Sequence, residues 1–188
     1  MEDQLLIHII DRCKRGERSA QTELYSRYYR GMYSVCLRIL NHSAEAEDAM
    51  QDAFIAAFKN LEHFKGEVTF GSWLKRIAIN RSIDLMRKRK VKYEDLSRVP
   101  DWSENDQDEY SSEMTPEMIK TAISKLNDNH RIVLTLYLLE GYDHDEISSI
   151  LNISNGSSRI IYHRAKEKLK IQLKEMKPMF NTIENGSI

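Results

Sequence analysis

The chain has 188 residues, a formal net charge of −1, three prolines and seven glycines. That length suits one ordinary domain or two small ones, and the scarcity of helix-breaking residues favours helices over strands. No apolar run reaches the roughly 20 residues needed to cross a bilayer. The acids Glu2 and Asp3 are unlike the basic start of a signal peptide, and Cys13 and Cys36 have no metal-like spacing. We therefore expect a cytoplasmic protein without a metal or cofactor.

Charge is strongly segregated along the chain, although it nearly cancels overall. Residues 75–92 contain eight bases and one acid, residues 94–113 contain eight acids and one base, and residues 159–177 are basic again. The acidic stretch shows no hydrophobic periodicity and carries Pro100, which is typical of a solvated linker. We therefore expect an all-α protein in which a flexible acidic linker over 91–114 joins two small helical domains.

The first domain, over residues 1–90, is predicted to contain four helices around one core. One covers 2–15, the second begins at a cap at Ser19, the third at a cap at Ser43, and the fourth near Thr69. The third has a very regular apolar stripe at i, i+3, i+4 and i+7, formed by Ala46, Ala49, Met50, Ala53, Phe54, Ala57, Phe58 and Leu61. The predicted buried face of the fourth consists of Phe70, Trp73, Leu74, Ile77, Ala78 and Leu85.

The second domain, over residues 115–178, is predicted to contain four shorter helices and to be followed by a disordered tail over 179–188. Thr115 and Pro116 indicate a helix start, with Thr as the cap and Pro in the first turn. The hydrophobic pattern places the helices near 116–126, 128–140, 144–151 and 155–177.

Residues 141–165 have the pattern of a helix-turn-helix. Asp143 can cap the first helix, Asn152 can take the left-handed turn, and Ser154 can cap the second helix. The second helix carries an outward basic ridge, as a DNA major groove requires, formed by Arg159, His163, Lys166 and Lys170. A solvated helix in a plain helical hairpin is the alternative. The run from Asp143 to Glu146 also has the residue types of a metal site, but helix capping accounts for it better.

The third helix presents a polar face opposite its apolar stripe. That face carries Asp48, Gln51, Asp52 and Ile55. An exposed Ile among carboxylates suggests a protein-docking surface, although an ordinary solvated face with one stray apolar residue explains the pattern equally well.

The fourth helix presents a ridge at i, i+4, i+7 and i+11 beside its buried stripe, formed by Arg76, Asn80, Ile83 and Arg87. The bases at 88–90 extend its positive field, so phosphate contacts would supply affinity there and Asn80 could hydrogen-bond a base. Phe70 and Trp73 resemble stacking platforms, but their spacing favours the core. Arg81 is predicted on the buried side, paired locally with Asp84.

Two blocks, residues 45–54 and 70–87, resemble region 2 of the sigma-70 superfamily, and residues 126–169 resemble region 4. The chain has no room for the additional domains of housekeeping sigma factors, so it resembles the extracytoplasmic-function group. The resemblance implies that region 2 binds a coiled coil on the polymerase β′ subunit and opens the −10 promoter element. It also implies that region 4 binds the β flap and reads the −35 element, that the linker runs toward the RNA exit path, and that an anti-sigma factor restrains the protein.

Roles carry over by position. The polymerase-binding set is Asp48, Gln51, Asp52 and Ile55. The −10 set is Arg76, Asn80, Ile83, Arg87 and Lys88. The −35 set is Ser157, Arg159, Ile160, His163 and Arg164. The sequence departs from the family at Asn152, where relatives have Gly, and at Ser158, where many have a buried Val and where we expect a loss of packing.

Two other classes of protein compete with a sigma factor. An activator or repressor could use a related helix-turn-helix to bind its site without polymerase. An enzyme is the more distant possibility, because no paired carboxylates, nucleophile with a base, or phosphate-binding glycine loop stands out. We therefore expect no catalytic activity and no small-molecule substrate.

Overall fold

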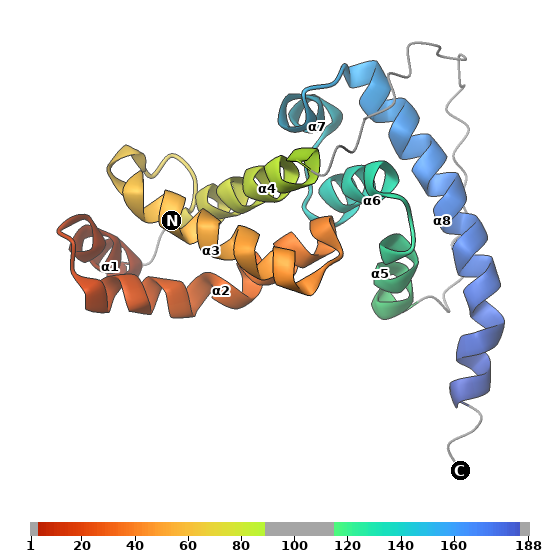
Figure 1. The fold of residues 1–188 in the computed structure, drawn as a ribbon, viewed down its shortest axis with the longest axis horizontal. Coiled ribbons are helices and arrows are strands. Elements are labelled where there is room, and N and C mark those ends of the chain that lie inside the picture. Colours follow the sequence, from red (N-terminus) through yellow and green to blue (C-terminus); the bar gives the residue numbers. More distant parts are fainter. Residues whose placement is uncertain (1–3, 89–114, 185–188) are drawn as a thin grey trace. The chain divides into compact units, whose positions relative to one another are not determined.

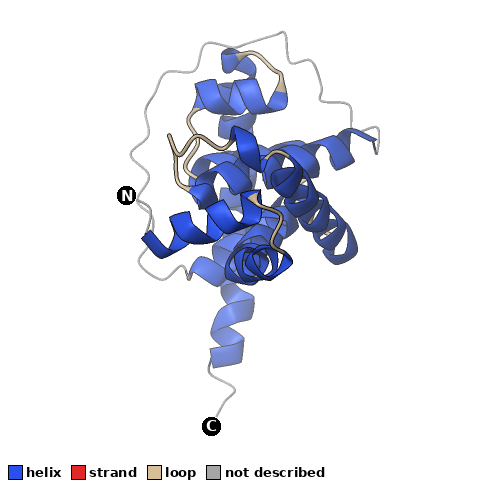
Figure 2. Ribbon diagram, turned by 90° about the vertical axis from the view of Figure 1, so that its left-hand side faces the viewer, coloured by secondary structure: helices blue, strands red, loops and turns tan. Residues whose placement is uncertain are grey.

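The computed structural model describes residues 4–88 and 115–184, the last eight of these as backbone only. Within these ranges every regular element is a helix, as Figures 1 and 2 show. The chain divides into two compact units, one holding the helices before the acidic stretch and one holding the helices after it. The prediction of an all-α protein with two helical domains is therefore confirmed, while the predicted linker over 91–114 lies outside the described residues.

The first unit packs three long helices against one another and adds a short one. Helices α2, α3 and α4 contact each other in pairs, and α1 packs on α2 (Figure 1). Their bounds are α1 Gln4–Lys14, α2 Arg18–Leu40, α3 Ser43–Lys59 and α4 Phe70–Lys88, with a 3₁₀ turn at Leu61–His63. The largest fully buried side chains of this core are Ile9, Leu24, Ile39, Leu40, Phe70, Leu74, Ile79, Ile83 and Met86. Of these, Phe70 and Leu74 belong to the buried face that was predicted for the fourth helix.

Two helix starts in this unit differ from the predicted caps. Helix α2 begins at Arg18, so Ser19 is already inside it and accepts a hydrogen bond from Arg12 Nη2 at 3.1 Å instead. Helix α3 begins at Ser43, and His42 is the capping residue, with Nδ1 accepting from the Glu45 N–H at 3.5 Å. The capping residue of α2 is Glu17, so the predicted caps were placed two residues too far along the chain for α2 and one residue too far for α3.

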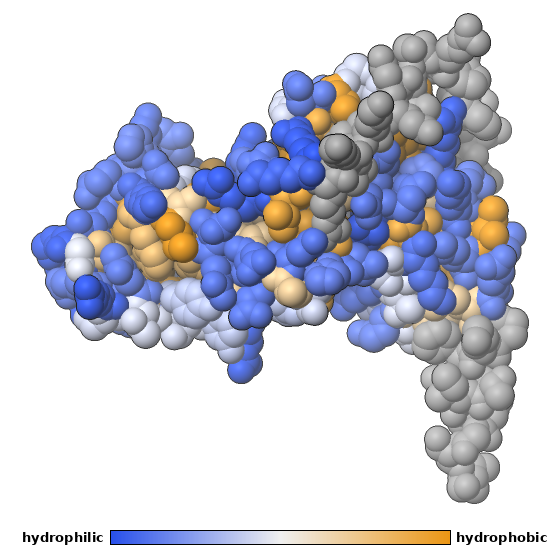
Figure 3. All heavy atoms as spheres, in the orientation of Figure 1, coloured by the Kyte–Doolittle hydropathy of each residue, from blue (hydrophilic) through white to orange (hydrophobic). Residues whose placement is uncertain are grey.

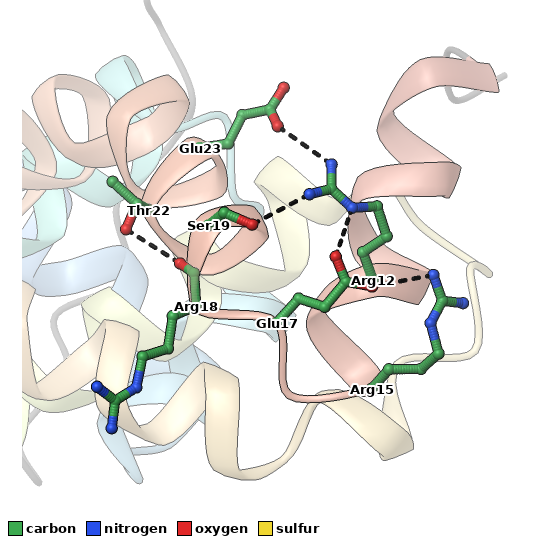
Figure 4. Close-up of polar contacts among 7 residues, drawn as sticks. All are labelled: Arg12, Arg15, Glu17, Arg18, Ser19, Thr22 and Glu23. Atoms are coloured by element: carbon green, nitrogen blue, oxygen red, sulfur yellow. Dashed lines mark hydrogen bonds and ion pairs between the residues drawn. The ribbon is translucent and has the colours of Figure 1, made fainter.

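A single arginine joins α1 to α2 across their tight turn. Arg12 Nε donates to Glu17 Oε2 at 2.8 Å, and Nη1 lies 3.8 Å from Glu23 Oε2 (Figure 4). The hydrogen bond from Arg12 lowers the pKa of Glu17. These contacts orient the turn, although such exposed pairs add little to stability.

The second unit consists of α5 Pro116–Ser124, α6 Asp128–Leu134, α7 His144–Leu151 and α8 Asn155–Glu184, with a π-helical turn at Thr135–Leu139 continuing α6. Thr115 caps α5 as predicted, because its hydroxyl accepts the Met118 N–H at 3.2 Å. The hydrophobic core joins α5 and α6 to α8 and is formed by Met118, Ala122, Ile123, Leu126, Leu134, Ala165, Leu169, Leu173 and Met176. The predicted disordered tail from 179 conflicts with the structure, since α8 continues to Glu184; residues 185–188 lie outside the description.

Candidate nucleic-acid and protein interfaces

The polar face of α3 lies in solvent as the sequence predicted. Asp48, Gln51 and Asp52 are exposed, and Ile55 is 51% exposed although α3 supplies many core residues. Gln51 Nε2 donates to Glu47 Oε1 at 3.4 Å, which is a weak contact. The structure thus brings these four side chains together on one accessible helical face. On the face of the molecule drawn in Figure 3, apolar patches are surrounded by hydrophilic residues.

Four of the five residues assigned to the −10 set are exposed on α4, namely Arg76, Asn80, Arg87 and Lys88. The prediction for Ile83 is wrong, because its side chain is 1% exposed and belongs to the core. Helix α4 packs against both α2 and α3, so its buried stripe is wide enough to include the edge of the ridge. Bases 89 and 90, which were expected to extend the ridge, lie outside the described residues.

Arg81 was predicted on the buried side of α4 and is in fact exposed next to Asn80. The partner predicted for it, Asp84, is instead 3.7 Å from Arg87 Nη1. Arg81 therefore adds a positive charge to the exposed surface of α4. Buried residues lie on both sides of Arg81 along α4, so its exposure depends on which helices pack beside α4, and the sequence alone does not show this.

An aromatic cluster anchors the loop between α3 and α4. Phe64 is buried, with its ring centroid 5.6 Å from that of Phe70 and 5.3 Å from that of Trp73. Residues 65–69 beyond it are exposed. Phe70 is a core residue as predicted, whereas Trp73 is only partly buried. The loop is thus fixed at Phe64 and presents residues 65–69 to solvent.

The helix-turn-helix of the second unit has the predicted geometry. Asp143 Oδ1 accepts the Glu146 N–H at 2.8 Å while Glu146 Oε2 accepts the Asp143 N–H at 3.0 Å, which forms a capping box. Asn152 adopts the left-handed conformation with φ of 55°. Ser154 Oγ accepts the Ser157 N–H at 3.0 Å at the start of α8.

Four of the five residues assigned to the −35 element reach the surface of α8. Arg159 and Arg164 are exposed, and Ser157 and His163 are partly exposed. The prediction for Ile160 is wrong, because it is 5% exposed and packs into the unit. Its side chain is therefore not available to touch a thymine methyl. Within the basic ridge, Lys170 forms an ion pair with Glu167, with Nζ and Oε1 2.9 Å apart.

A buried polar pair, which the sequence did not reveal, connects the two helices of the motif. Ser158 is fully buried, and its Oγ lies 2.9 Å from His144 Nδ1. The imidazole stacks on Tyr137, with centroids 4.8 Å apart, and meets the edge of Tyr162. The predicted loss of packing at Ser158 is thus compensated by a hydrogen bond, whose partner is 14 residues away in the sequence.

The environment of His144 disfavours its charged form. Burial lowers its pKa, and the positive charges of Arg159 and His163 lower it further, while Asp143 and Asp145 act in the opposite direction. The imidazole therefore acts as a hydrogen-bonded core group. Throughout the part of the chain that is described, no cluster of three His, Cys, Asp or Glu side chains could hold a metal ion, and no helix is long and apolar enough to cross a membrane.

Comparison with protein families matches both units separately. The family described as Sigma-70 region 2 matches residues 24–91, and the family described as Sigma-70, region 4 matches residues 117–169. These ranges include α4 with its ridge and the whole helix-turn-helix.

Several characterised proteins are similar over nearly their full lengths. ECF RNA polymerase sigma factor SigW of Bacillus subtilis is 33% identical over 179 residues, which cover 89% of this chain and 96% of that protein. RNA polymerase sigma factor YlaC of the same organism is 30% identical, covering 81% of this chain and 91% of that protein. The ECF RNA polymerase sigma-E factor of Escherichia coli is 26% identical, covering 90% and 93%.

Two solved structures share the fold. Sigma factor RpoE from Bartonella quintana, in complex with anti-sigma factor NepR, aligns with a TM-score of 0.55 at 20% identity and covers 81% of this chain and 96% of that one. CnrH, in complex with the cytosolic domain of CnrY, aligns with a TM-score of 0.51 at 20% identity and covers 89% and 96%.

Proposed function

The chain belongs to the extracytoplasmic-function group of RNA polymerase sigma factors, and from this premise we propose which of its surfaces bind polymerase and which bind promoter DNA. It is a regulatory DNA-recognition protein that binds core RNA polymerase and directs initiation at specific promoters. The similar proteins give no support to an activator or repressor that acts without polymerase.

The first unit docks on polymerase through α3 and contacts the −10 element through α4. The exposed set on α3 consists of Asp48, Gln51, Asp52 and Ile55. It combines hydrogen-bond acceptors with one apolar side chain, which suits a surface that binds the helices of the β′ coiled coil. On α4, Asn80 lies between the exposed basic residues Arg76 and Arg81. Their contacts with DNA phosphates can position the Asn80 side chain against the edge of a nucleobase. The exposed loop 65–69, anchored at Phe64, lies at the start of α4 and supplies backbone groups for a flipped base.

The second unit reads the −35 element through the first turns of α8 and contacts the β flap. The observation that carries this assignment is the orientation of α8, whose apolar residues Ile160, Ile161 and Ala165 are buried while Arg159 and Arg164 are exposed. Arg side chains at the start of a capped recognition helix are suited to base edges in the major groove.

The remaining proposals concern location and partners. We assign the protein to the cytoplasm, where polymerase and promoter are, and assign it no catalytic step of its own. An anti-sigma factor is a proposed partner. This is supported by the complexes in which proteins of the same fold have been solved.

Transcription with purified core polymerase and a library of genomic promoter fragments tests the function as a whole. Specific transcripts are expected only when the chain and core polymerase are both present. In the same assay Asn80→Ala should reduce open complexes on duplex promoters and change the −10 base preference, and premelted templates should partly restore opening. Unchanged preference at every −10 position would remove Asn80 from base reading.

A further inference from the structure

A chain of side-chain hydrogen bonds leads from α7 to the exposed arginine of the recognition helix. Asn155, the first residue of α8, donates from Nδ2 to Asp145 Oδ1 at 2.6 Å. Its Oδ1 accepts from Arg159 Nε at 2.9 Å. Asp145 lies in the first turn of α7, so three residues separated by up to 14 positions form one connected relay across the helix-turn-helix.

The direction of each bond in this relay follows from chemistry. A carboxylate only accepts hydrogen bonds and a guanidinium only donates them, so the group between them must donate on one side and accept on the other. The Asn amide does both at the required length. An Asp at 155 would repel Asp145, and an Ala would leave Arg159 Nε without this acceptor.

We propose that Asp145 and Asn155 are positioning residues that set the orientation of the Arg159 guanidinium for −35 base recognition, an inference that rests on the proposed role of Arg159. With Nε engaged by Asn155, the Nη1 and Nη2 edge is the one presented to the groove. That edge can make the bidentate contact with O6 and N7 of guanine. Part of the rotamer entropy that Arg159 would lose on binding is already lost in the free protein, which favours specific over nonspecific contacts.

The test measures base preference with reconstituted holoenzyme and a promoter library randomised across the −35 element. Arg159→Ala identifies the positions that Arg159 reads. Asn155→Ala should lower the preference at those same positions by about two- to ten-fold, the value of one lost hydrogen bond, while preference elsewhere stays unchanged. Ser149→Ala is the matched control, since Ser149 Oγ bonds only the main-chain carbonyl of Asp145 and not its side chain.

An exchange of the two side chains gives a rescue with the same net charge. Asn155→Asp alone places two carboxylates together and should lower preference at the Arg159 positions. Asn155→Asp combined with Asp145→Asn restores a donor facing an acceptor at both links and should return the preference close to wild type. Circular dichroism of each variant confirms that α7 and α8 remain folded.

Three outcomes overturn the relay while leaving the role of Arg159 intact. They are an unchanged preference in Asn155→Ala, a change confined to positions that Arg159→Ala does not affect, and a combined variant no better than Asn155→Ala. The second outcome would make Asn155 a base-reading residue itself. If instead Arg159→Ala leaves every preferred base unchanged, the proposed function of Arg159 fails and the relay fails with it.

Discussion

Ser158 and His144 show how one buried polar pair replaces an apolar contact in the helix-turn-helix. Because Ser158 Oγ is 2.9 Å from His144 Nδ1, removing the hydroxyl leaves a buried ring nitrogen without this partner. Ser158→Ala should therefore destabilise the second unit by about 1–3 kcal/mol. The same change in a His144→Phe background should cost much less, since the partner is already absent. Urea unfolding followed by the NMR signals of α7 and α8 measures both effects, and equal losses in the two backgrounds would contradict the coupling.

The same histidine predicts a pH dependence of stability. Its pKa in the folded protein lies below the ordinary value of about 6.5, so the unfolded chain binds the proton more tightly. The contribution of neutral His144 is fully present above about pH 6.5 and is lost as the pH falls through the folded pKa. His144→Gln should therefore reduce the acid sensitivity of the second unit in the same urea experiment. A variant as acid-sensitive as wild type would refute this account.

At the scale of single residues, the sequence predicted caps and turns well, but it predicted the edges of buried helical faces poorly. The caps at Asp143 and Ser154 and the turn at Asn152 depend on neighbours within a few positions, which the sequence displays. Ile83 and Ile160 were wrongly assigned to DNA contacts and are buried. The width of a buried stripe depends on which helices pack beside it, and the sequence of one helix does not show this. The links from Ser158 to His144 and from Asn155 to Asp145 cross the turn, so periodicity along one helix carried no trace of them.

Helix α3 combines a core stripe with an exposed acidic face, and this predicts a specific defect in polymerase binding. Asp48→Lys with Asp52→Lys should weaken holoenzyme formation by about 2–5 kcal/mol, because charges desolvated in an interface lose their partners. Helicity should be unchanged, since neither side chain contributes to the core. Competition for core polymerase against unmodified protein measures the loss.

The control for that variant reverses the same number of charges elsewhere in the unit. Asp11→Lys with Glu23→Lys changes exposed acids on α1 and α2, and the ion pair of Glu23 with Arg12 is a surface pair of little energetic value. If both double variants lose affinity to the same extent, the general charge of the unit determines the affinity. If neither loses affinity, α3 is not the docking surface.

The ends of elements were less predictable than their existence. Helix α2 begins two residues earlier and α3 one residue earlier than the Ser caps predicted, and α8 extends to Glu184 although the pattern suggested an end near 177. Helix α6 passes into a π-helical turn at Thr135–Leu139, which hydrophobic spacing does not distinguish from a regular helix. Packing partners and terminal hydrogen bonds determine such ends, and a single sequence shows neither.

Across the whole molecule, the two helical units follow from two independent hydrophobic patterns separated by the acidic stretch. Each unit has its own core, and each matches a separate family region. The eight acids between 94 and 113 have the sign opposite to that of the bases on α4 and α8. They should therefore not bind DNA, and we expect them in polymerase to lie along the path through which the negatively charged nascent RNA emerges.

Neutralising the linker is the prediction that concerns both units together. Replacing its acids with Ser and Gly should change initiation, seen as the yield of abortive and full-length transcripts, more than it changes promoter binding. The reason is that the negative linker repels the negative RNA. Removing the linker charge therefore alters the competition between the linker and the RNA for the same path. A linker with the same residues in shuffled order keeps the charge and should behave as wild type. If the neutral linker gives unchanged abortive and full-length yields, the segment is only a spacer, and communication between the units must run through polymerase and promoter DNA.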